Sequence, residues 1–162
     1  MPLDSPTFVA PNNQDLLLMD VADAELFGSV GELLGVQYLG ESSYLEQSSV
    51  LKGIVFGQNK RLMINLQCKR KAATNWVNIF FLVDTGSQYT YLAPSSIDKL
   101  AGGKNKTLNV LVSSETVCIE CYLSPQDKHF RDMNVLGMEA MSKLGFSNFR
   151  IDFNANEFFI KK

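Results

Sequence analysis

The sequence has few of the residues that build metal centres and disulfide frameworks. Its 162 residues include one histidine, His129, and three cysteines. An odd and low cysteine number argues against a disulfide-bonded scaffold and is typical of a reducing compartment. Cys118 and Cys121 form a C-x-x-C pair within ETVCIECYL, but residues three apart on a strand point to opposite faces. We therefore expect buried or half-buried thiols, no metal site and no cofactor.

Long hydrophobic runs and a basic surface are also missing. No apolar run reaches the roughly 18 residues of a membrane span, and the formal net charge is −2. Basic residues gather only at the two ends of 60–71, which predicts a strand with charged ends rather than a phosphate-binding patch. The N-terminus resembles neither a secretory signal nor a transit peptide. These observations predict no nucleic-acid partner, no membrane partner and, by default, a cytoplasmic location.

The first fifty residues contain no lysine or arginine and carry only acidic charges. Apolar residues over 14–27 are partly at helical spacing, and Gly28, Gly31 and Gly35 interrupt the pattern. We predict an acidic, partly ordered N-terminal extension over 1–50 and a separate domain over 51–162. The sequence leaves open whether the extension is a mobile or partner-binding arm or a packed cap.

From residue 51 the pattern is that of strands. Alternating or apolar runs predict strands over 49–57, 61–69, 75–84, 107–114 and 116–124. Short polar turns predict that 61–69 and 75–84 form one hairpin and 107–114 and 116–124 another, with a C-terminal hairpin around 154–156. The stretch APSSIDKLAGG predicts a short helix with Pro94 near its start, and MEAMSKLGF predicts another helix of about two turns. The domain is therefore expected to be mostly β with one or two short helices.

The most apolar of these runs, IFFLV, predicts a strand that is buried on both faces, and it leads directly into Asp84. Burying a carboxylate is unfavourable unless neighbouring groups form hydrogen bonds or ion pairs with it. Gly86 permits a tight turn whose amide can approach the carboxylate, while Thr85 and Ser87 supply hydroxyl groups that can hold the loop or the carboxylate. Asp84 could also start an ordinary turn, as aspartate often does after a strand.

Two elements together resemble the retroviral-type (retropepsin-like) aspartic proteases. In that family, D-T/S-G-A/S follows a hydrophobic strand, and a hydrophobic-hydrophobic-Gly element packs across the active-site loop and leads into a helix. The matching residues here are Asp84, Thr85, Gly86 and Ser87 for the loop and Val135, Leu136 and Gly137 for the supporting element. The resemblance covers about residues 51–160 and implies a single-lobe acid-protease β-barrel.

The resemblance also implies that Asp84 is the catalytic acid. Peptide hydrolysis of this kind needs two carboxylates that share one proton. The chain has one such loop, because Asp98, Asp127, Asp132 and Asp152 occupy no comparable strand-acid-glycine context. The second carboxylate is therefore expected from Asp84 of another copy across a two-fold axis. The resulting hypothesis is a homodimeric aspartic endopeptidase, akin to retroelement proteases, that acts on peptides or proteins.

The lid that the family places over its cleft is expected to be reduced. Between Gly86 and Gly137 the only glycine pair is Gly102-Gly103. The run LVSSETVC, or the N-terminal extension, could cover the cleft instead. The alternative hypothesis is a catalytically inactive retropepsin-like domain that serves dimerisation, peptide binding or assembly. A third hypothesis treats D-T-G as a plain turn of an unrelated β-barrel.

Several large side chains close to these motifs have a structural and a functional interpretation. Tyr89 and Tyr91 follow the loop on one strand face and could line a cleft, although core packing is the stronger expectation. Trp76 is expected in the core or in dimer packing, and Met138 and Met141 in the core.

Overall fold

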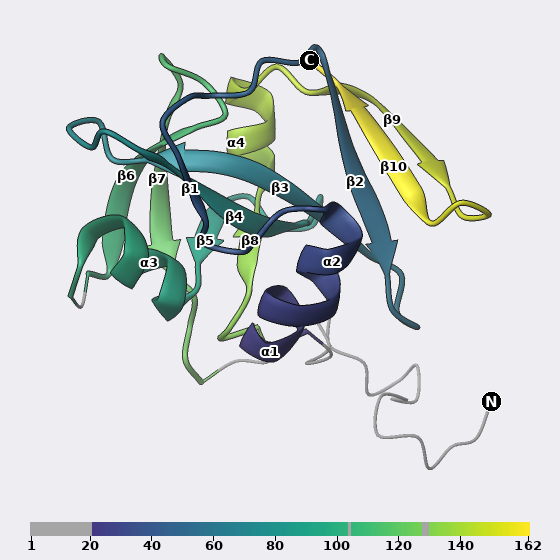
Figure 1. Ribbon diagram of the computed structural model, residues 1–162, viewed down its shortest axis with the longest axis horizontal. Helices are drawn as coiled ribbons and strands as arrows, with labels where there is room; N and C mark the ends of the chain where they lie inside the picture. Colours follow the sequence, from purple (N-terminus) through teal and green to yellow (C-terminus); the bar gives the residue numbers. More distant parts are fainter. Residues whose placement is uncertain (1–20, 104, 128–129) are drawn as a thin grey trace.

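The alternating and apolar runs form ten strands in the computed structural model, which describes residues 21–103, 105–127 and 130–162 (Figure 1). The strands are β1 (Glu41–Ser42), β2 (Val50–Phe56), β3 (Arg61–Lys69), β4 (Trp76–Val83), β5 (Thr90–Leu92), β6 (Thr107–Val112), β7 (Cys118–Leu123), β8 (Asn134–Leu136), β9 (Ser147–Asp152) and β10 (Glu157–Lys161). The helices are α1 (Asp23–Glu25), α2 (Gly31–Leu34), α3 (Pro94–Ala101) and α4 (Met138–Lys143), with a π-helical segment, η2 (Leu26–Val30), between the first two. No helix of these ranges is long and apolar enough to span a bilayer.

The predicted strands and the mostly β fold class are confirmed. The run over 61–69 forms β3 and pairs antiparallel with β4, as its alternation and the polar turn after it predicted. The hairpins β6–β7 and β9–β10 also form where they were expected. Helix α3 starts at Pro94, whose fixed φ suits a first helical position. After residue 50 the described chain has two short helices, α3 and α4.

Six strands close a barrel. Hydrogen bonds connect them in the order β3, β4, β8, β5, β7 and β6, and β6 pairs again with β3. The pairs β4–β8 and β5–β7 are parallel, whereas the other pairs of the ring are antiparallel. Strands β2, β10 and β9 continue the sheet from β3 and extend away from the barrel on the right of Figure 1.

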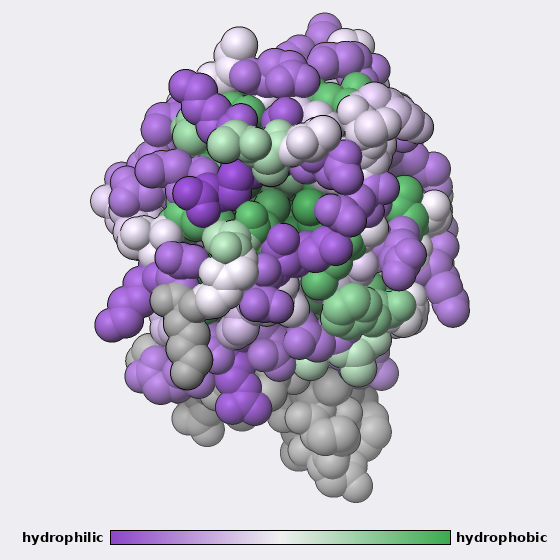
Figure 2. Space-filling model, turned by 60° about the vertical axis from the view of Figure 1, so that its left-hand side comes forward, coloured by the Kyte–Doolittle hydropathy of each residue, from purple (hydrophilic) through white to green (hydrophobic). Residues whose placement is uncertain are grey.

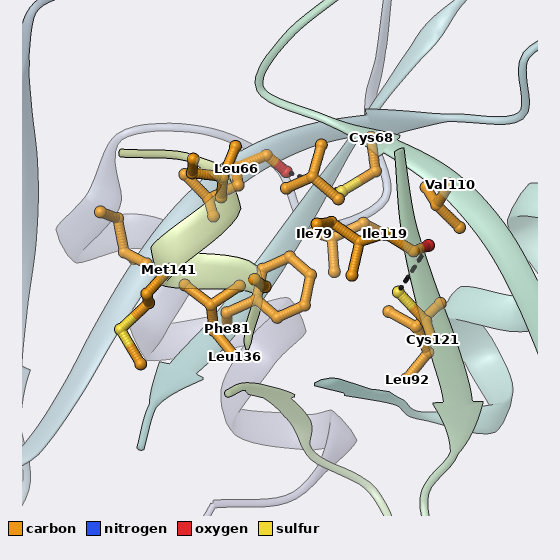
Figure 3. Close-up of a cluster of buried hydrophobic side chains, with 14 of the residues drawn as sticks. Leu66, Cys68, Ile79, Phe81, Leu92, Val110, Ile119, Cys121, Leu136 and Met141 are labelled. Atoms are coloured by element: carbon orange, nitrogen blue, oxygen red, sulfur yellow. Dashed lines mark hydrogen bonds between the residues drawn. The ribbon is translucent and has the colours of Figure 1, made fainter. Parts of the chain in front are cut away.

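Strand β4 is buried on both faces, as its uninterrupted apolar run predicted. Its odd-numbered residues, such as Ile79 and Phe81, point into the barrel, where they pack with Leu136 and Met141 (Figure 3). Its even-numbered residues Phe80 and Leu82 point outward into a second apolar cluster. A covered outer face is the reason why the run does not alternate between apolar and polar residues.

The second cluster is completed by the N-terminal segment. Val21, Leu26, Val30 and Tyr38 are almost fully buried against the outer face of β4. The described residues 21–40 therefore form a packed cap, which was one of the two possibilities left open. The stretch 14–27, whose partly helical spacing predicts a short helix or turn, is helical from residue 23, and the helical segments continue to residue 34. Residues 14–20 lie outside the described part of the chain, so the prediction stays untested there. The division of the chain at residue 50 stays a prediction.

Candidate active site

Asp84 lies at the edge of the barrel where two parallel strands end. In the ladder between β4 and β8, Leu82 pairs with Val135 and Val83 with Leu136. Both strands therefore deliver their next residues, Asp84 and Gly137, to the same edge. The backbone N–H of Asp84 donates to the Leu136 carbonyl at 3.1 Å, so the ladder continues up to the acid itself.

The carboxylate of Asp84 is held by its own loop. The backbone N–H of Gly86 donates to Asp84 Oδ1 at 2.9 Å, and that of Ser87 donates to the Asp84 carbonyl at 3.2 Å. A Cβ atom at residue 86 would lie 3.2 Å from the same carboxylate oxygen, which is why glycine suits the close approach. Asp84 is half-buried, whereas Thr85 and Gly86 are exposed. The acid is thus fixed in place and still reachable from solvent.

The element 135–137 packs across this loop from the other side. A Cβ atom on Gly137 would collide with the carbonyl group of Tyr89, so only glycine fits. Immediately after it, the N–H groups of Met138 and Glu139 donate to the carbonyls of Ser87 (2.8 Å) and Gln88 (2.9 Å). The start of α4 is therefore fastened to the residues that follow Asp84.

Two hydroxyl groups complete the bracing. The buried Thr90 Oγ1 accepts a hydrogen bond from the N–H of Gly137 at 3.1 Å. Ser87 Oγ donates to the Tyr89 carbonyl at 2.9 Å, so in this structure it holds the loop backbone and not the carboxylate. The structure brings all seven sequence-predicted residues together at one edge of the barrel; their catalytic roles stay predictions.

Sequence reasoning missed a buried polar network behind the loop. Asn134 Oδ1 accepts from the N–H of Ala93 at 2.8 Å, and Asn134 Nδ2 donates to the Phe80 carbonyl at 3.0 Å and the Tyr38 hydroxyl at 2.8 Å. Tyr38 in turn contacts Ser96 Oγ at 2.7 Å. Burial raises the pKa of the Tyr38 phenol, so it stays neutral. The only signal in the sequence is a polar residue directly before V-L-G.

A shallow open groove runs beside the Asp84 loop. It is lined by residues 85–88 from the loop and by Met138, Glu139 and Ser142 from α4. Met138 is 48% exposed, so its expected core position is wrong, while Met141 is buried as expected. Tyr89 is 43% exposed, so its expected core packing is wrong, whereas Tyr91 is half-buried and packs against the second apolar cluster as expected. Trp76 is a core residue, with the Lys69 ammonium 4.9 Å from its ring centre.

The run LVSSETVC does not cover this groove. Cys68 on β3 pairs with Val112 at the end of β6 and with Val77 near the start of β4. The tip that follows Val112 therefore lies at the opposite end of β4 from Asp84, about 20 Å away along the strand. Residues 102–106 alone connect α3 to β6, a link too short for a further hairpin. Residues 1–20 lie outside the described part, so a lid from the N-terminal extension stays a prediction.

Two of the cysteines lie in the barrel core and the third faces solvent, and none of them lines the groove. Cys121 is buried in the barrel and Cys118 on the same strand is exposed, so Cys118 is more exposed than expected. Cys68 and Cys121 donate to the carbonyls of Leu66 and Ile119 (Figure 3). Burial raises the pKa of Cys121 to about 12, which makes it an inert core thiol. Across the three described ranges, His, Cys, Asp and Glu form no metal-binding group of three.

Comparisons with known proteins add one likeness of fold. No family model matches the chain, and no curated protein matches it. Among solved structures, the chain is similar to a retropepsin-like aspartic protease from Rickettsia conorii, with 22% identity over 72% of this chain and 95% of that chain and a TM-score of 0.44. Such values do not assign a family, so the function has to follow from the site itself.

Proposed function

We propose that the chain is an aspartic-type endopeptidase that works as a homodimer. Asp84 and Asp84 of a second copy share one proton across a two-fold axis. The ionised carboxylate takes a proton from a water molecule, and the protonated one donates to the carbonyl oxygen of the scissile peptide bond. No cofactor is needed for this chemistry.

The Asp84 loop is the observation that supports the proposal. Its carboxylate is half-buried at the end of β4, bound by the N–H of Gly86, while β8 and α4 fasten the loop from outside. Such fixation keeps an acid in one orientation, which proton transfer requires. The described chain has one loop of this kind, and Glu139 in the groove is already paired with Lys143 at 3.1 Å. A second copy is the natural source of the missing acid.

The direct test is cleavage of a fluorogenic peptide library between pH 3 and pH 7. Asp84→Asn should lower turnover by about a thousandfold or more, because neither base nor acid remains. The matched control is Asp152→Asn, which changes an aspartate in a turn remote from the β4–β8 edge and should leave turnover unchanged. Cleavage that survives Asp84→Asn would overturn the proposal.

A mixing experiment tests the shared site. After subunit exchange, about a quarter of the dimers in an equal mixture of wild-type and Asp84→Asn chains should be wild-type, so the mixture should have about a quarter of the activity of the same total concentration of wild-type protein. If each chain acted alone, half of the activity would remain. Sedimentation at the assay concentration should show a dimer for both proteins. The alternative, a peptide-binding domain without turnover, predicts dimers and peptide binding but no cleavage by the wild-type chain.

A further inference from the structure

Three tyrosines form a surface cluster next to the groove. Tyr91 on β5 and Tyr122 on β7 are register partners in a parallel pair, with ring centroids 6.1 Å apart. Tyr89, at the end of the Asp84 loop, meets Tyr122 edge to face at 5.6 Å. Tyr91 also contacts Phe130, with ring centroids 6.1 Å apart; Tyr91 and Tyr122 are half-buried, and Tyr89 is exposed. Aromatic rings in this arrangement offer open faces to a ligand.

The cluster lies in a field of negative charge. Glu120 is exposed two residues before Tyr122 on the same side of β7, and Glu139 is in the first turn of α4. The backbone N–H of Glu139 donates to the carbonyl of Gln88, the residue before Tyr89. Desolvation raises the pKa of the Tyr122 phenol, and the charges of Glu120 and Glu139 raise it further. Glu139 pairs with Lys143, while Glu120 forms no ion pair with any residue that the structure describes.

The cluster adjoins the groove beside Asp84, because Tyr89 directly follows the loop residues that line it. The carbonyl of Tyr89 receives the Ser87 hydroxyl, and Glu139 lines the groove together with residues 85–88. A peptide that lies along the groove would therefore place one of its side chains over the tyrosines. Figure 2, which turns the β6–β7 side of the molecule toward the viewer, shows a mostly hydrophilic surface with small hydrophobic areas between the polar side chains.

The chemistry of this surface selects a cation. The faces of tyrosine rings attract ammonium and guanidinium groups, and the nearby exposed Glu120 carboxylate adds a charge-assisted hydrogen bond. An acidic side chain would be repelled by Glu120 and Glu139, and an apolar one would gain no such hydrogen bond from Glu120. We propose that Tyr89, Tyr91 and Tyr122, with Glu120, form a subsite for a lysine or arginine side chain of the substrate peptide; this rests on the proposed function.

Binding to the full-length Asp84→Asn protein tests the subsite without cleavage. The probes are fluorescein-labelled octapeptides with a central Leu-Phe pair, in which one flanking position at a time carries lysine, norleucine or glutamate. Fluorescence anisotropy should show one position at which lysine binds about tenfold more tightly than norleucine. Glutamate at that position should bind more weakly than either.

Two further substitutions in the Asp84→Asn protein test whether the preference for lysine comes from the tyrosine cluster. Glu120→Gln should reduce the preference for lysine about fivefold, and Tyr122→Leu should reduce it while circular dichroism stays unchanged. Glu115→Gln, an equal change of charge at the exposed tip of the β6–β7 hairpin, is the matched control and should leave the preference intact. Equal affinities for lysine and norleucine at every position, or equal effects of Glu115→Gln and Glu120→Gln, would overturn the subsite.

The outcomes separate the two proposals. If the wild-type chain cleaves the peptides without discriminating lysine from norleucine, the subsite fails and the protease stands. If it cleaves none of them but the lysine preference depends on Glu120, the subsite stands and the protease fails. An absence of both binding and cleavage would contradict both.

Discussion

Asp84 and Asp152 each end a strand, and each accepts hydrogen bonds from backbone N–H groups just after it. Asp84 Oδ1 accepts from Gly86 at 2.9 Å, and Asp152 Oδ1 accepts from Asn154 at 3.0 Å and Ala155 at 3.1 Å. As local turns the two are alike, and both fit the ordinary preference of aspartate for such positions. A search by local hydrogen bonds alone would not tell them apart.

The difference lies in what surrounds each turn. The Asp152 turn is the exposed end of the β9–β10 hairpin, where residues 153–156 face solvent and Asn156 offers its carbonyl to Val55 of β2 (Figure 1). The Asp84 loop is fastened by the second strand β8, by the start of α4 and by the Thr90 hydroxyl. The hypothesis of a plain turn fits Asp152 well, and it leaves the bracing of Asp84 without an explanation.

Among the substitutions that compare the supported Asp84 loop with the Asp152 turn, we expect Gly137→Ala to destabilise the protein most. The new methyl group would collide with the Tyr89 carbonyl, and both strands at that edge would have to move. We expect a loss of about 3 kcal/mol in the free energy of unfolding, measured in urea, together with loss of cleavage. Gly145→Ala at the other end of α4 is the control: it has a positive φ of 72° but open space around it, so it should cost about 1 kcal/mol. Equal losses of stability in Gly137→Ala and Gly145→Ala would show that the close approach of Gly137 to the Tyr89 carbonyl is unimportant.

The next effect tests the hydroxyl that joins β5 to the supporting element. Thr90→Val keeps the shape of the side chain but leaves the buried N–H of Gly137 without an acceptor, so unfolding should become easier by about 2 kcal/mol. Thr90→Ser keeps the hydroxyl and removes a methyl group, which should cost about 1 kcal/mol. Thermal and urea unfolding of the pair measure the difference. If the valine variant were as stable as the serine variant, the hydrogen bond between Gly137 and Thr90 would not contribute to the stability of this edge.

We expect the smallest loss of stability from a substitution in the Asp152 turn. Asp152→Ala removes the acceptor for two exposed N–H groups and should cost about 1 kcal/mol, with cleavage unchanged. Asp84→Ala should have a stability cost of similar size, about 1 kcal/mol, but should abolish cleavage. Urea unfolding and the peptide assay on the same preparations make the comparison. Loss of cleavage in Asp152→Ala would mean that the C-terminal hairpin contributes to the site.

Much of the barrel could be predicted because its signals are local. The alternation over β3, the proline at the start of α3 and the polar turns between strands each specify a few consecutive residues. The apolar run of β4 likewise predicted burial on both faces, although not what covers them. The Asp84 loop followed from four adjacent residues and from one resemblance.

The remainder depended on contacts between distant parts of the chain. Nothing near Tyr38 indicates that its hydroxyl meets Asn134, since the two are 96 residues apart. Met138 was expected in the core because α4 was assumed to bury that side, but the helix starts at the groove and turns Met138 outward. The tyrosine cluster was ambiguous for the same reason, because Tyr89 and Tyr91 become a surface only when Tyr122 joins them.

The hydrogen bond between Tyr38 and Asn134 has a consequence for how the molecule opens. If residues 21–40 detached, the Asn134 amide would lose a buried partner and Phe80 would face water. Detachment of the cap would therefore expose the outer face of β4 and weaken the β4–β8 pair. The amides of the cap and of that pair should exchange their hydrogens with deuterium in one concerted event, with a common free energy of opening. In that case the segment before residue 41, which looks like an appendage in the sequence, would unfold together with the barrel that it covers.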